Sequence, residues 1–169
     1  MRPTLTFALT VLGATSILAQ DVWKLDEASG FKQFKIGSDF AAYTPQIDPG
    51  TGRYNGTCCT TAFGIRVAGI LLEPDNLGKL GRIVIDMCPD PKASLEVKQA
   101  LQSKLFHAIE AAFGSAGGDL DKLTNHWNWV GQRITLEFKY DNVGPNCFMS
   151  LVYSPTLGTE YGQPNPTDY

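Results

Sequence analysis

Residues 133–140 alternate strictly between polar and apolar side chains. Alternation with a period of two indicates a β-strand that buries one face and exposes the other. Such strands form antiparallel sheets with one wet face, because parallel sheets are covered on both sides. We therefore predict a strand from about Asn128 to Tyr140. Its apolar face holds Ile134, Leu136, Phe138 and Tyr140, and its polar face holds Arg133, Thr135, Glu137 and Lys139.

Two stretches earlier in the chain predict a β-hairpin. Residues 60–73 and 80–87 both alternate, and the segment between them is rich in turn-forming residues, from Pro74 to Gly78. A fourth strand is expected at Phe148–Ser154. The apolar positions of the hairpin are Phe63, Ile65, Val67, Gly69 and Leu71 on the first strand and Ile83, Ile85 and Met87 on the second.

Residues 95–114 predict one amphipathic helix. Ser94 is a typical N-terminal cap and Gly114 a typical end, with apolar residues between them at spacings of three and four. The order β-β-α-β-β predicts an α+β fold, in which this helix covers one face of an antiparallel sheet of about four strands. The expected stripe comprises Val97, Leu101, Leu105, Ala108, Ile109 and Ala112.

The two ends of the chain differ from the part between them. Residues 1–19 have a basic start at Arg2, an apolar stretch and a small residue at position 19, as a signal peptide does. A membrane anchor is the alternative, but its span needs about 20 mostly apolar residues. We expect cleavage after Ala19, a single domain over residues 20–157 and a flexible tail over 158–169. The mature protein is then periplasmic or secreted and has no membrane span.

Four cysteines, Cys58, Cys59, Cys88 and Cys147, suggest disulfides in an exported chain. A bond between Cys58 and Cys59 would close a strained eight-membered ring, and neighbours in an extended segment point to opposite faces. Two long-range bridges are therefore the main expectation, with Cys59 bonded to Cys147 and Cys58 to Cys88. The alternative is a reduced Cys58–Cys59 pair that binds a soft metal or carries out redox chemistry.

Charge and composition exclude some classes of function. The net charge is −3, the pI is near 5.3, and the 14 lysines and arginines are scattered along the chain. A nucleic-acid-binding domain normally has a basic face, so no nucleic-acid partner is expected. The hydrophobic content of 43% and the charged content of 18% indicate a globular domain.

Familiar catalytic and cofactor motifs are missing from the sequence. It contains no His-Glu-x-x-His pair, no Gly-x-Ser-x-Gly elbow and no complete phosphate loop. His107 lies on the helix and His126 at the start of a strand, and we expect both to be surface residues. Asp86 and Glu137 fall opposite the core faces of their strands, where single charges are ordinary and a catalytic pair is the less favoured interpretation. We predict no catalytic residue, no metal and no cofactor.

Trp127 and Trp129 are the candidate residues for binding a partner. Alternation places them on one strand face, opposite the set from Ile134 to Tyr140 unless Gly131 marks a bulge. If exposed, the two rings would form a stacking platform or a hot spot for a partner. If buried, they would cap one end of the core, and burial is the favoured interpretation.

The layout resembles a loose group of uncharacterised exported bacterial proteins. Their pattern is a Phe-x-x-hydrophobic-x-Gly segment, a hairpin, an amphipathic helix that closes on Gly, and an aromatic-x-Trp-x-Gly strand. The matching ranges are 34–37, 66–87, 95–114 and 127–131 with its continuation to Tyr140. The resemblance implies a fold and a compartment but no activity, and the four cysteines are not part of the pattern.

These observations lead to three functional hypotheses. The leading one is an exported, non-enzymatic domain that binds a protein, a glycan or an envelope component, on the fold-level analogy of small hydrolase inhibitors and assembly factors. The alternative is a thiol- or metal-dependent enzyme, or a metal handler, that uses Cys58 and Cys59. The third is a purely structural role without a ligand.

Overall fold

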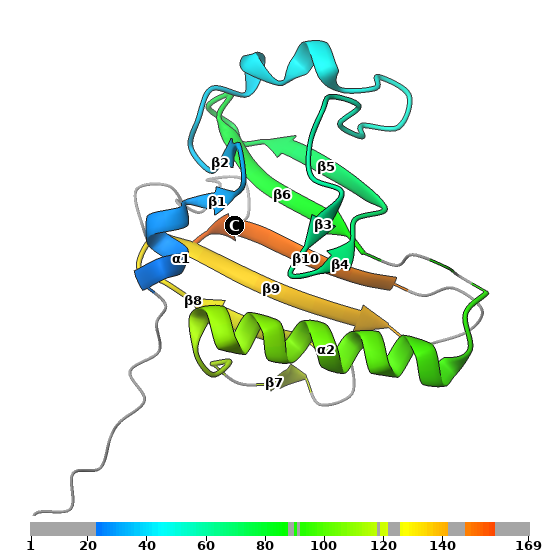
Figure 1. Ribbon diagram of the computed structural model, residues 1–169. Helices are drawn as coiled ribbons and strands as arrows, with labels where there is room; N and C mark the ends of the chain where they lie inside the picture. The colour runs from blue at the N-terminus through cyan, green and yellow to red at the C-terminus, as the bar shows by residue number, and fades with distance from the viewer. Residues whose placement is uncertain are drawn as a thin grey trace, which may run out of the picture.

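The computed structural model describes residues 23–87, 90, 92–117, 119–121, 126–141 and 148–157. In this part of the chain the largest unit is an antiparallel sheet of six strands, in the order β5-β6-β10-β9-β8-β7 (Figure 1). The expected α+β class and antiparallel sheet are thus confirmed, with two strands more than expected. The strands are β5 (Gly69–Pro74), β6 (Leu80–Asp86), β7 (Asp119–Asp121), β8 (His126–Val130), β9 (Ile134–Asp141) and β10 (Phe148–Pro155).

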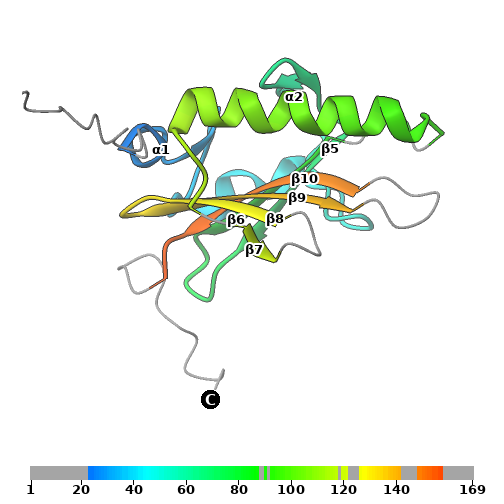
Figure 2. The same ribbon diagram turned by 90° about the horizontal axis from the view of Figure 1, so that it is seen from below.

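Helix α2 (Leu95–Phe113) lies along one face of this sheet, as Figure 2 shows. Its predicted caps are present: the Ser94 side chain accepts a hydrogen bond from the Val97 backbone N–H, and Gly114 follows the last turn with φ +82°. Val97 was expected in the buried stripe but is 50% exposed, because this end of the helix projects past the strand ends (Figure 1). The buried residues of α2 are Leu105, Ile109 and Phe113.

Short elements cover the rest of the core on the side of α2. The Phe31 ring of one small hairpin lies 6.1 Å from the Tyr153 ring of β10, and Phe63 of another lies 6.1 Å from Phe113 of α2. Both hairpins contribute buried side chains to the core cluster that contains the helix. These elements are α1 (Trp23–Ala28), β1 (Gly30–Phe31), β2 (Phe34–Lys35), η1 (Phe40–Ala42), η2 (Thr44–Gln46), β3 (Thr61–Ala62) and β4 (Ile65–Arg66).

The prediction of one continuous strand over residues 60–73 is wrong. The structure divides it into β3, β4 and β5, because Phe63 and Gly64 adopt positive φ angles of 49° and 74° and turn the chain back. After that turn Ile65 is buried as predicted, but residues 67 and 68 belong to no strand, and the alternation of β5 is shifted relative to the prediction. Ile70 and Leu72 are buried, whereas the prediction placed Leu71 inward.

The strand predicted over residues 128–140 is likewise two strands, β8 and β9, which are paired with each other. The chain reverses at 131–133, so Trp129 lies opposite Leu136 and Trp127 opposite Phe138. Both Trp residues therefore face the same side as the apolar set of β9, contrary to unbroken alternation. Gly131 is required here because an added Cβ would come within 2.5 Å of an Asp26 carboxylate oxygen.

Candidate functional site

The sheet face opposite α2, called the open face below, carries polar side chains. Glu73 pairs with Arg82 across β5 and β6, and Asn128 pairs with Glu137 across β8 and β9. Each of the four has a buried neighbour in the sequence (Leu72, Ile83, Trp129 and Leu136), so alternation along each strand directs these side chains away from α2. The open face is thus the wet face that the alternation of residues 133–140 predicted.

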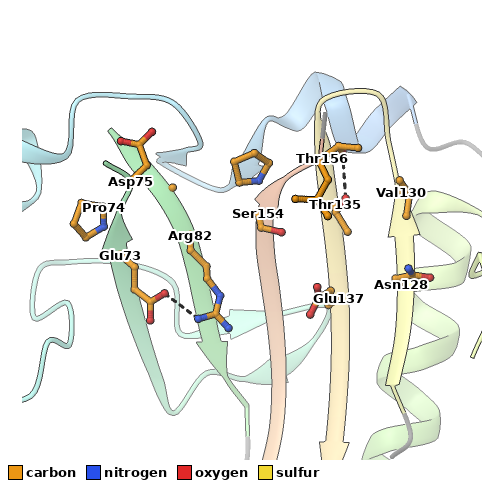
Figure 3. Close-up of a pocket in the computed structure, with 13 residues that line it drawn as sticks. Glu73, Pro74, Asp75, Arg82, Asn128, Val130, Thr135, Glu137, Ser154 and Thr156 are labelled. Carbon is orange, nitrogen blue, oxygen red and sulfur yellow. Dashed lines mark hydrogen bonds and ion pairs between the residues drawn. The ribbon is translucent and has the colours of Figure 1, made fainter. Parts of the chain in front are cut away.

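One end of the open face is hollowed, with a volume of about 700 Å³. The β5–β6 turn and the end of β10 bend away from α2 (Figure 2), and both contribute residues that line the hollow. Figure 3 shows the charged and hydroxyl side chains that point into this hollow. The hollow is lined by Glu73, Pro74, Asp75, Gly81, Arg82, Asn128, Val130, Thr135, Glu137, Ser154, Pro155, Thr156 and Leu157.

Two features fix the walls of the hollow. Arg82 Nη1 lies 2.9 Å from Glu73 Oε2, which joins β5 to β6 by a partly exposed ion pair. On the opposite wall, the Thr135 and Thr156 hydroxyl groups lie 3.1 Å apart (Figure 3). Thr156 Oγ1 also donates to the Gly131 carbonyl at 3.0 Å. These contacts position the side chains before any ligand arrives.

Glu137 is at the centre of a second charged group. Its Oε2 atom lies 2.8 Å from Lys139 Nζ and 3.2 Å from His126 Nε2. Partial burial by itself raises the pKa of Glu137, but the hydrogen bond and charge of Lys139, and then those of His126, hold the pKa below its usual range. Glu137 is therefore an anion on the floor of the hollow at neutral pH.

This environment predicts a pH-dependent effect of Glu137→Gln. Because the folded-state pKa is lowered, the ionised Glu137 stabilises the fold above its unfolded pKa, and this contribution is lost as the pH falls through the folded pKa. We expect the variant to lose about 0.5–1 kcal/mol of unfolding free energy at pH 7 and less than that at about pH 3, where the carboxyl group of the unfolded chain is protonated. Urea denaturation at both pH values measures the difference.

The control for that experiment is Glu27→Gln, which removes the same charge from an exposed position on α1. This variant should stay within about 0.5 kcal/mol of the wild type at both pH values. A Glu137→Gln effect of equal size at pH 7 and pH 3 would show that Lys139 and His126 do not stabilise the carboxylate.

His107 is a surface residue, as expected: its side chain is 72% exposed and lies 3.4 Å from Glu110 on the same helix. His126, at the start of β8, was also expected at the surface, but its side chain is only 21% exposed because it packs against Glu137 of the neighbouring strand. Asp86 lies 3.4 Å from Arg53, and strand β10 separates it from Glu137. Both carboxylates lie opposite the core, as expected. Among the described residues, no group of three or more His, Cys, Asp or Glu side chains could hold a metal ion.

Trp129 cannot present its ring to a partner, because the residue is 1% exposed. Its Nε1 donates to the Gly114 carbonyl at 2.8 Å, and its ring lies 6.0 Å from Phe106. Trp127 is half-buried and stacks on Phe138 at 5.2 Å. The favoured interpretation, burial, is confirmed for Trp129, and the hypothesis of an exposed Trp pair is wrong.

Cys58 and Cys59 are bonded to each other, with their Cα atoms 3.7 Å apart. The expected bonds of Cys59 to Cys147 and of Cys58 to Cys88 are therefore wrong in the structure. The expectation assumed an extended segment, but residues 56 and 57 form a bend and the segment belongs to no strand. Cys88 and Cys147 lie outside the described residues, as do the predicted signal peptide and the C-terminal tail.

Sequence reasoning did not single out Arg82, Asn128 or Ser154, three residues that line the hollow. A signal was available for Arg82 and Ser154, since each is a polar residue in an apolar strand.

None of the helices in the described ranges is both long enough and apolar enough to span a membrane. Compared with protein families, curated proteins and solved structures, the chain matches none of them.

Proposed function

We propose that the protein is an exported, non-catalytic domain that binds a polypeptide partner in the hollow of the open face. The observation that carries this proposal is the hollow itself. Five neighbouring strands contribute side chains to it, on a face that α2 leaves uncovered. The part of the proposal that concerns export rests on the sequence pattern of residues 1–19.

The lining of the hollow favours a polypeptide over other ligands. Val130 is 48% exposed and Leu157 is 85% exposed, and both line the same hollow as the Glu73–Arg82 ion pair, which β9 and β10 separate from Val130. Protein interfaces combine an apolar patch with a polar rim, and they are enriched in arginine. A partner segment with one apolar anchor and an acidic side chain for Arg82 fits this arrangement.

Site-specific photo-crosslinking tests the proposal. Benzoylphenylalanine is introduced at Val130 in the hollow and, as a control, at Lys104, which is exposed on α2. After irradiation in the native host, we expect polypeptide adducts from position 130 and none from position 104. Adducts of equal yield at the two positions, or none at position 130, would overturn the proposal. Adducts that contain glycan and no peptide would overturn the polypeptide proposal and identify the ligand as a sugar.

Reversal of the Arg82 charge adds a quantitative prediction. Arg82→Glu should reduce the adduct yield at position 130 about tenfold, the effect of losing roughly 1.4 kcal/mol of binding free energy. Lys104→Glu makes the same charge change away from the hollow and should leave the yield unchanged. An undiminished yield with Arg82→Glu would show that Arg82 does not contact the partner.

A further inference from the structure

The Cys58–Cys59 disulfide lies in the segment that leads from Tyr54 to β3 (Figure 1), and neither cysteine lines the hollow. Both cysteine side chains are partly buried and touch the edge of the core cluster. Neither belongs to the open face, which lies on the other side of the sheet. The bond therefore needs an explanation separate from the binding of a partner.

Stabilisation of the fold does not explain this bond. A disulfide acts mainly by restricting the unfolded chain, and its effect grows with the number of residues in the closed loop. Cys58 and Cys59 are adjacent, so the loop that they close is the shortest one possible. A bond between distant residues would restrict the chain far more.

Hydrogen bonds hold the same segment without help from the disulfide. Tyr54 N donates to the Ile70 carbonyl at 2.9 Å, and Val67 N donates to the Thr60 carbonyl at 3.0 Å. Between these two contacts, Gln33 Nε2 donates to the Thr57 carbonyl at 3.0 Å. The segment is thus anchored before, beside and after the cysteines, and it can keep its course when the sulfur–sulfur bond is open.

The surroundings of Cys58 also suit the reduced form. Its Sγ atom lies 3.5 Å from Gln33 Oε1, an acceptor oxygen. A disulfide sulfur has no hydrogen to donate, whereas the thiol of reduced Cys58 can donate to this oxygen. Reduction therefore gains a hydrogen bond that the oxidised form cannot make.

We propose that Cys58 and Cys59 form a thiol–disulfide exchange site for a dithiol reductant. One thiolate of the dithiol attacks a cysteine Sγ, which breaks the Cys58–Cys59 bond and forms a mixed disulfide. The second thiolate of the dithiol then attacks the sulfur that the dithiol contributes to that mixed disulfide, and the protein cysteine leaves as a thiolate. Two electrons pass to the protein, each cysteine takes up a proton, and the dithiol leaves as a disulfide.

The test uses the mature protein, equilibrated with mixtures of reduced and oxidised dithiothreitol and then alkylated with N-ethylmaleimide. We expect peptide mapping to show Cys58 and Cys59 bonded to each other at the oxidising end and both alkylated at the reducing end. The change should be reversible, and the circular dichroism spectrum should stay that of the folded protein. A bond that opens only on unfolding, or one that joins Cys58 or Cys59 to Cys88 or Cys147, would overturn the proposal.

Two variants separate exchange from a structural role. The double variant Cys58→Ser, Cys59→Ser should fold and keep the crosslink at Val130, and failure to fold would show that the bond is structural. Gln33→Leu removes the acceptor beside Cys58. It should lower the equilibrium constant for reduction of the Cys58–Cys59 bond by dithiothreitol about threefold. An unchanged constant would show that the Gln33 oxygen does not favour the thiol form.

Discussion

Replacing Trp129 with alanine is expected to lower the free energy of unfolding by about 3–5 kcal/mol. The ring is 1% exposed and fills the space between α2 and the sheet. Its removal leaves a cavity beside Phe106 and Leu136. It also leaves the Gly114 carbonyl, at the end of α2, without its 2.8 Å donor. Urea denaturation monitored by circular dichroism measures the loss.

Trp129→Phe separates the two parts of this effect. Phenylalanine keeps most of the packing but has no N–H group, so we expect a loss of about 1–2 kcal/mol. Trp127→Ala is the matched control, because that ring is only half-buried against Phe138. A Trp129→Ala variant within about 1 kcal/mol of the wild type would contradict the burial of the ring and would restore Trp129 as a partner-binding candidate.

Helix α2 was predictable because its signals are local. The N-terminal cap at Ser94, the glycine at 114 and the apolar spacing all lie within the segment itself. Even so, the predicted stripe began a turn too early, at Val97. Whether the first turn of a helix meets a core depends on where the strands end, and the helix sequence holds no information about that.

The strands were predictable in character but not in extent. Alternation correctly placed Ile134 and Phe138 in the core and Glu137 on the wet face. It failed at Phe63–Gly64 and at residues 131–133, where the chain turns back inside an apparently continuous pattern. The second turn is held by a carboxylate more than one hundred residues earlier in the chain, so the local sequence contains little sign of it.

The open face illustrates the same limit. The sequence indicates that Glu137 and Asp86 lie opposite the core, but the hollow depends on strand order. β10 lies between β6 and β9, which brings Arg82 and Thr135 to the same hollow. That order arises from long-range pairing, which periodicity alone cannot supply.

The Cys58–Cys59 bond was missed because the segment was assumed to be extended.

The two proposed sites lie on opposite sides of the sheet and can be tested independently. The hollow is on the open face, whereas the disulfide lies beside the short hairpins that cover the core. The core between them is continuous, so a substitution that weakens it affects both sites. Variants that test function should therefore be chosen at exposed or partly exposed positions such as Arg82 and Gln33.

The N-terminal helix α1 is attached to the sheet through the buried side chain of Leu25 and through the carboxylate of Asp26. One carboxylate oxygen accepts from the Gln132 backbone N–H at 2.7 Å, and the other accepts from those of Arg133 and Ile134 at 2.8 and 2.9 Å. Hydrogen bonds to a charged acceptor are stronger than neutral ones. The three together close the β8–β9 turn, which decides the face on which Trp127 and Trp129 lie.

Asp26→Ala is therefore expected to lower the free energy of unfolding by about 2–4 kcal/mol, and Asp26→Asn by about 1–2 kcal/mol, since one amide oxygen can still accept. Hydrogen exchange should show faster exchange of the Gln132, Arg133 and Ile134 amides in both variants. Asp39→Ala, which removes a single 3.3 Å cap at the exposed η1, is the matched control, with an expected loss of about 0.5 kcal/mol. Equal losses for Asp26→Ala and Asp39→Ala, with unchanged exchange at residues 132–134, would mean that the β8–β9 turn forms without Asp26. The two strands would then be held by their own pairing and by the side-chain contacts between them.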